Sequence, residues 1–164
     1  MSKQGKIDRI DLKILAALQA DARITNQALA DAVGLSPSPC LQRVKRLEQR
    51  GILKGYLGRV SLDTIAHSVT VIAAVSLESH AKQQFDRFEQ AAAAIPELVE
   101  CHKVSGPFDY FLRFVCADVQ TYEQISDGLL LNGPAGMKVS SHVVLQETKP
   151  FTGYPLEQLV EVET

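Results

Sequence analysis

Apolar residues in the first fifty positions recur every three or four residues, the spacing of one face of an α-helix. The first stripe consists of Ile7, Ile10, Ile14, Leu15 and Leu18. A second helix is predicted from Thr25, whose hydroxyl can cap the first turn, to Gly34, which suits the left-handed position after a helix. A third stripe follows within residues 37–49. Two short helices joined by a tight glycine turn predict a helix-turn-helix.

The start of the third helix is ambiguous, because Ser36, Pro37, Ser38 and Pro39 follow one another. Either serine could cap the helix, and either proline is tolerated in a first turn. Proline disfavours helical angles in the residue before it, so Pro39 favours Ser38 as the cap. The buried side is predicted to consist of Cys40, Leu41, Val44 and Leu47.

Glycines punctuate residues 51–60, and this pattern predicts a small hairpin or wing. We assign residues 1–60 to a winged helix-turn-helix domain and residues 61–68 to a linker.

The second half alternates between strand and helix patterns. Strands are predicted at 69–77, 99–105, 110–116 and 139–145, and helices at 85–95 and 122–129. Gly106, Pro107, Phe108 and Asp109 supply turn chemistry between the two middle strands. The order βαββαβ predicts a ferredoxin-like domain over residues 69–164, and therefore an α+β protein overall.

Both helices of that domain should pack on one face of its sheet. The opposite alternation also contains apolar residues, namely Ile72, Ala74, Phe111 and Val115. Nothing else in the chain is long enough to cover this second face, so we expect another copy of the same sheet to cover it.

The net charge of −2 conceals two regions of opposite sign. Residues 1–59 hold 11 Lys and Arg against 5 Asp and Glu, a balance of +6, whereas residues 60–164 hold 6 against 14, a balance of −8. A basic module joined to an acidic one indicates that the first half meets a polyanion.

Composition excludes several other classes of protein. Three separated cysteines without CxxC spacing predict neither disulfides nor a zinc site, and we expect all three to be reduced and buried. No metal or cofactor is expected. The chain shows no signal peptide and no apolar run long enough to span a membrane, which predicts a cytoplasmic protein.

The outward side of the third helix carries groups suited to DNA. Arginine can bind guanine, glutamine can bind adenine, and other cations can pair with phosphates. A solvated charged face is the alternative, but Glu48 is the only acid between residues 36 and 54, which favours double-stranded DNA. The predicted DNA contacts are Ser36, Ser38, Pro39, Gln42, Arg43, Arg46 and Arg50.

Several stretches of the chain together resemble the Lrp/AsnC family, the feast/famine regulators. They are residues 10–15, 22–26, 33–40, 43–48, 51–52, 100–106 and 108–110. The resemblance covers nearly the whole chain. It implies a DNA-binding transcription regulator whose second domain dimerises through its sheet, often builds tetramers or octamers, and binds a small effector such as an amino acid between subunits.

The resemblance also implies where this effector binds. The implied residues are Gly106, Asp109, Tyr110, Ser140 and Ser141. Glycine would let a ligand approach the backbone, and Asp109 could face an ammonium group. On the residues alone, Gly106 and Asp109 could instead form a simple turn, with Tyr110 in the core. Pro107 and residues 132–137 depart from the usual family pattern, which leaves the effector's identity open.

Two rival functions remain from other classes. One is a small ferredoxin-like enzyme, but HExxH, GxSxG and phosphate-loop motifs are all absent, and His142 lies in an apolar strand. The other is a ligand-binding module whose basic half docks an acidic protein. Preference for one DNA sequence over competing DNA would separate these functions.

Overall fold

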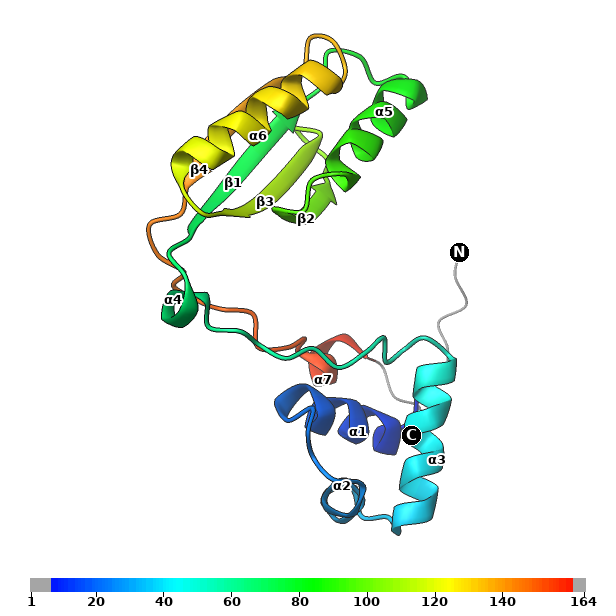
Figure 1. The fold of residues 1–164 in the computed structure, drawn as a ribbon. Helices are drawn as coiled ribbons and strands as arrows, with labels where there is room; N and C mark the ends of the chain where they lie inside the picture. The colour runs from blue at the N-terminus through cyan, green and yellow to red at the C-terminus, as the bar shows by residue number, and fades with distance from the viewer. Residues whose placement is uncertain (1–6, 161–164) are drawn as a thin grey trace. The chain divides into compact units, whose positions relative to one another are not determined.

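The computed structural model describes residues 7–160, and these divide into two compact units (Figure 1). The first unit includes the chain up to Arg59 together with the C-terminal segment from Lys149, and the second extends from Val60 to Thr148. The C-terminal segment therefore belongs with the helix-turn-helix, whereas the sequence analysis assigned it to the second domain.

Three helices build the first unit. They are α1 (Arg9–Ala20), α2 (Asn26–Val33) and α3 (Pro37–Gln49). Asp8 caps α1 by accepting from the N–H of Asp11 at 2.8 Å. Thr25 caps α2 through the N–H of Ala28, and Gly34 ends it in a left-handed conformation with φ 74°. These two features confirm the predicted bounds of the second helix.

Helix α3 begins two residues earlier than the favoured cap implied. Ser36 is the N-cap, so the prediction of Ser38 is wrong. Pro37 and Pro39 both fit inside the first turn, where the backbone N–H groups have no partner within the helix and a missing donor costs little. The hydroxyl of Ser36 makes no capping hydrogen bond.

The core of the first unit lies between its three helices. Ile14, Ala30, Cys40 and Leu47 are fully enclosed there. Leu41 is 43% exposed, which corrects the prediction that it faces inward. The buried side of α3 is centred on Cys40, Val44 and Leu47, and Leu41 points about a quarter of a turn away from that centre.

The predicted hairpin does not form within residues 51–60, none of which belongs to a strand. Ile52 and Leu53 pack partly against the core of the first unit, whereas residues 54–60 are exposed and bury no side chain that would hold a hairpin in place. The linker that follows contains one short helix, α4 (Leu62–Ile65).

The C-terminal segment packs against α1 through the short helix α7 (Leu156–Leu159), seen beside α1 in Figure 1. The Gln19 side chain donates to the carbonyl of Tyr154 at 3.2 Å and accepts from its N–H at 2.8 Å. Leu156 packs against the core of the first unit. Nothing in the sequence pattern predicted this contact.

The second unit is a four-stranded antiparallel sheet with two helices on one face, which confirms the ferredoxin-like order (Figure 1). Its strands are β1 (Val69–Ser76), β2 (Leu98–Lys103), β3 (Tyr110–Cys116) and β4 (Lys138–Val143), in the order β2-β3-β1-β4. Helices α5 (Lys82–Ala93) and α6 (Val119–Asn132) pack over the core residues Val71, Phe88, Tyr110, Leu112 and Phe114.

The other side of this sheet, which we call the open face, is not covered by any helix of the second unit, residues 60–148. Strand register places Ile72 there between Arg113 and His142, and places Ala74 between Phe111 and Ser140. Phe111 remains 40% exposed. The two central strands thus place Ile72, Ala74 and Phe111 on the open face, with Arg113 among them, and the edge strand β4 adds Ser140 and His142. None of the helices in residues 7–160 is long and apolar enough to cross a membrane.

Candidate DNA-binding and effector sites

Helix α3 places most of the predicted DNA contacts on the surface. Ser36, Ser38, Pro39, Gln42, Arg46 and Arg50 are exposed. Two exposed residues that the prediction omitted, Lys45 and Gln49, lie on the same outward side. Arg43 is different, because its side chain is only 25% exposed and lies toward α1. The outward side could donate to base edges and phosphates, as the sequence indicated.

The turn before α3 is fixed by a hydrogen bond that the sequence analysis did not foresee. The Asn26 side-chain amide donates to the carbonyl of Pro37 at 2.9 Å, which joins the start of α2 to the first turn of α3. The N–H of Leu35 also donates back to the carbonyl of Ala30 at 2.9 Å. These bonds set the angle at which α3 leaves the turn.

An acidic pair on α1 holds two of the predicted DNA-contacting arginines. Asp11 is 1% exposed, and its carboxylate accepts from Arg43 Nη1 at 2.7 Å and from Arg46 Nη2 at 2.8 Å. Arg43 Nη1 also donates to Asp8. We name these four side chains, Asp8, Asp11, Arg43 and Arg46, the arginine clamp. The only sequence feature that indicated this clamp was Asp11, an acid beside the apolar stripe of α1.

Two members of the clamp, Asp8 and Arg43, have shifted pKa values that favour their charged forms. Partial burial alone would raise the pKa of Asp8, but the hydrogen bonds from the Asp11 N–H and from Arg43 outweigh it, so the net pKa lies below its ordinary value. The hydrogen bonds to Asp8 and Asp11 raise the pKa of Arg43 above its ordinary value. The contact between Asp8 and Arg43 is therefore ionic at neutral pH.

The loop that was predicted to bind an effector is held tightly by the sheet. Gly106 has φ +121°, a conformation that suits glycine. Asp109 Oδ2 accepts from the N–H of Leu77 at 2.7 Å, and Oδ1 lies 3.0 Å from His80 Nε2. Both carboxylate oxygens thus have partners inside the domain, which favours the interpretation of Asp109 as a turn residue.

Tyr110 is a core residue. It is 1% exposed, packs against Phe88 at 4.3 Å between ring centroids, and donates its hydroxyl to Glu89 Oε1 at 2.6 Å. Burial, followed by the hydrogen bond to Glu89, raises its pKa well above the ordinary value. Its ring therefore faces the helices.

The two predicted serines lie on opposite faces of the sheet. Ser141 pairs with Ala73, and its hydroxyl lies within hydrogen-bond distance of the Tyr122 hydroxyl beneath α6. Ser140 lies on the open face, 3.3 Å from His142 Nε2. Ser140 is at the same end of the sheet as the loop, because it pairs with Ala74, and the carbonyl of the next residue, Val75, accepts from the N–H of Asp109 in the loop. The structure does not bring the two hydroxyls together.

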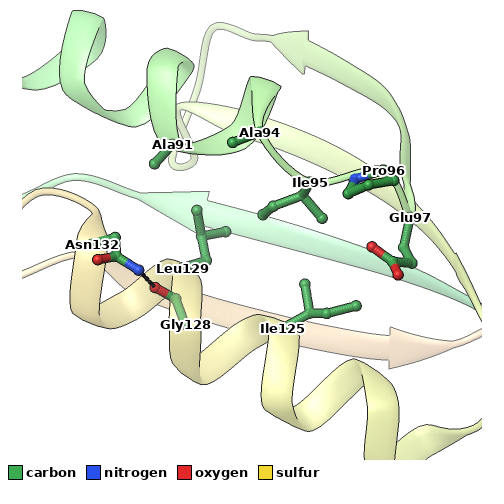
Figure 2. Close-up of a pocket in the computed structure, with 9 residues that line it drawn as sticks. All are labelled: Ala91, Ala94, Ile95, Pro96, Glu97, Ile125, Gly128, Leu129 and Asn132. Carbon is green, nitrogen blue, oxygen red and sulfur yellow. Dashed lines mark hydrogen bonds between the residues drawn. The ribbon is translucent and has the colours of Figure 1, made fainter.

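A cavity of about 350 Å³ lies between α5 and α6, away from the predicted effector residues (Figure 2). Its lining is mostly apolar and includes Ala91, Ile95, Ile125 and Leu129, with the Glu97 carboxylate at one side. It offers no paired charges for a zwitterion.

Within residues 7–160 no group of three His, Cys, Asp or Glu side chains could hold a metal ion. Cys40 and Cys116 are buried, but Cys101 is exposed, which corrects the prediction that all three are buried. Cys101 lies on β2, at the edge of the sheet, where only one neighbouring strand covers it.

This combination of units defines a class of protein, a helix-turn-helix regulator with an appended α+β domain. The family model described as winged helix-turn-helix DNA-binding matches residues 7–54, and the Lrp/AsnC ligand binding domain matches residues 70–154. The leucine-responsive regulatory protein of Escherichia coli is 39% identical over 148 residues, which cover 90% of each chain.

Solved structures agree with this match. A transcriptional regulator of Neisseria meningitidis, solved as a complex with L-methionine, is 33% identical with a TM-score of 0.86, over 94% of this chain and 100% of that one. A feast or famine regulatory protein of Mycobacterium tuberculosis, also complexed with L-methionine, is 27% identical with a TM-score of 0.78, over 90% and 97%.

The chain belongs to the Lrp/AsnC family of transcription regulators. It is a DNA-binding regulator, not an enzyme.

Proposed function

We propose that the outward side of α3 reads operator DNA, with Gln42 at its centre. The observation that carries this proposal is the exposed row of Ser38, Gln42, Lys45 and Gln49, with Arg46 and Arg50 beside it. With α3 in the major groove, side-chain donors would face the base edges and cations would face the phosphates. We assign Arg43 to the interior of the domain, and place the protein in the cytoplasm with the chromosome.

The test is selection of a binding site from a random DNA pool by the full-length protein. Gln42→Ala should reduce affinity for the selected site by about 1 to 3 kcal/mol and relax one base position. Gln27→Ala, on the exposed side of α2, is the matched control. Failure of the wild type to enrich any sequence, or an unchanged preference in the Gln42 variant, would contradict this reading of α3.

We further propose an amino-acid effector site at the end of the sheet formed by the loop 104–110. Relatives that bind L-methionine support the ligand class. Because Asp109 and Tyr110 are engaged internally, the backbone of the loop around Gly106 and the hydroxyl of Ser140 are the groups left to meet the ligand. Asp109 would then shape the loop rather than contact the ammonium group.

Calorimetry with L-methionine and L-leucine, followed by DNA titration at fixed salt, tests this site. Ser140→Ala should weaken binding, and Ser141→Ala, one residue along on the opposite face, should leave it nearly unchanged. A coupling of about 1 to 3 kcal/mol would change DNA affinity roughly 5- to 150-fold. Equal effects of the two serine variants would place the ligand elsewhere.

Self-association through the open face completes the proposal. A second copy would cover Ile72, Phe111 and Val115, and two-fold symmetry would present two copies of α3 to a palindromic site. Tetramers and octamers would add further contacts. Phe111→Lys should lower the mass seen in sedimentation, whereas Leu131→Lys, at an 82% exposed position on α6, should not. A monomeric wild type at micromolar concentration would refute the assembly.

A further inference from the structure

We infer that Asp11 is a positioning residue for sequence discrimination, because it fixes the Arg46 guanidinium at the edge of the outward side of α3. The inference rests on the proposed reading of DNA by that side. It assigns different roles to the two clamped arginines. Arg43 is an internal tie between α1 and α3, and Arg46 is a half-exposed DNA-contacting group supported from behind.

The contacts distinguish the two arginines. Arg43 donates from Nη1 to two carboxylates, to Asp11 Oδ1 at 2.7 Å and to Asp8, the N-cap of α1. Its side chain is only 25% exposed. Arg46 uses Nη2 alone, at 2.8 and 3.1 Å from the two oxygens of Asp11, and its side chain is 50% exposed. The guanidinium of Arg46 is therefore anchored at one nitrogen, with half its surface toward solvent.

A guanidinium is planar and carries five donors in a fixed fork. Anchoring one nitrogen from behind restricts the rotation of the fork, so the remaining donors meet a base edge or phosphate in a fixed direction. The ordering cost is then met during folding and not during DNA binding. The same carboxylate places a negative charge near the DNA surface, which weakens attraction to phosphate at every sequence.

These two effects predict an unusual change on removing the charge. In Asp11→Asn, affinity for nonspecific DNA should rise, because a carboxylate near the phosphates is lost. The ratio of specific to nonspecific affinity should fall roughly five- to tenfold, because Arg46 loses its anchor. A residue with a merely structural role would lower both affinities by one factor.

The experiment titrates full-length protein with the selected site and with a scrambled duplex at two salt concentrations. Asp31→Asn is the matched control, because it removes the same charge from the same unit. Asp31 is an exposed acid on α2 and lies outside the clamp. Its specificity ratio should match the wild type. Circular dichroism checks that each variant is folded.

Two outcomes decide the matter. A lower ratio with equal or higher nonspecific affinity supports the role of Asp11. An unchanged ratio overturns it, whether both affinities stay the same or both fall by one factor. If Asp11→Asn fails to fold, Arg46→Lys replaces it, because lysine keeps the charge without the fork. Its ratio should also fall about fivefold, and an unchanged ratio there overturns the inference.

A wild type that selects no sequence would instead remove the proposed reading of DNA on which the inference rests.

Discussion

The arginine clamp and the proposed effector loop each use a carboxylate as an internal tie, buried Asp11 in the clamp and partly buried Asp109 in the loop, but they leave different surfaces behind. Asp11 ties α3 to α1, and half of the Arg46 side chain still reaches solvent. Asp109 ties the loop to Leu77 and His80, and Tyr110 turns into the core. The proposed DNA-contacting surface is thus nearly complete within one chain, whereas the proposed effector loop offers backbone and little else.

This difference indicates where each function is assembled. Bases and phosphates can meet α3 of a single copy, with donors already in place. A zwitterion needs a fixed positive and a fixed negative partner, and the carboxylate of the loop is already engaged. In the proposed assembly, groups from a second copy complete that site, and the partly exposed Phe111 lies on the open face beside it.

The largest expected effect separates the two sides of α3. Leu47→Ala should reduce the free energy of unfolding of the first unit by about 2 to 5 kcal/mol, because a fully enclosed side chain leaves a cavity. Leu41→Ala, on the exposed side, should cost less than about 1 kcal/mol. Urea unfolding monitored by hydrogen exchange of α1 and α3 measures both. Similar losses would mean that α3 has no distinct outer side.

The next effect addresses Asp109 as a tie within the loop. Asp109→Ala leaves the N–H of Leu77 without its acceptor, and should reduce the free energy of unfolding of the second unit by about 1 to 3 kcal/mol. Asp86→Ala, an exposed acid on α5, should change it little. Hydrogen exchange of β1 and β3 is the measurement. An undisturbed sheet in Asp109→Ala would leave the carboxylate available for a ligand.

Sequence patterns predicted the regular elements because periodic burial is a local signal. Thr25 and Gly34 marked the ends of α2 through their own chemistry, and the alternation in β1 and β3 fixed which residues face α5 and α6. The cap at Ser36 was missed because two prolines can share one first turn. Leu41 was misplaced because hydrophobicity alone does not fix an angle around a helix.

The site residues were harder to predict, because their roles depend on partners distant in sequence. Arg43 and Arg46 looked like equivalent surface cations until Asp11, more than thirty residues away, distinguished them. Ser140 and Ser141 looked like one pair until strand register placed them on opposite faces. The packing of Leu156 on the first unit likewise depends on a contact that no local pattern encodes.

Alkaline conditions should act on the second unit through Tyr110. Its pKa is raised in the folded protein, so the unfolded chain ionises first as pH rises past the ordinary value of 10. Stability from Tyr110 is therefore complete below that pH and is lost above it. Tyr110→Phe should flatten this alkaline decline in the unfolding free energy, measured by urea titration between neutral and alkaline pH. An equally steep decline in the variant would exclude Tyr110 as its source.

Acid should act in the opposite sense on the first unit, through Asp8, and more weakly. Its pKa lies below 3.8 when folded, so the stability it contributes is present above that value and is lost as pH falls through the folded pKa. The effect should be small, because the Asp8 side chain is half-exposed and solvent screens its pairing with Arg43. Asp8→Asn should reduce the decline of the unfolding free energy of the first unit at low pH. Urea unfolding followed by hydrogen exchange in α1 measures this decline, and exchange in β1 should not change. A matching change in β1 would mean that the two units do not respond to acid separately.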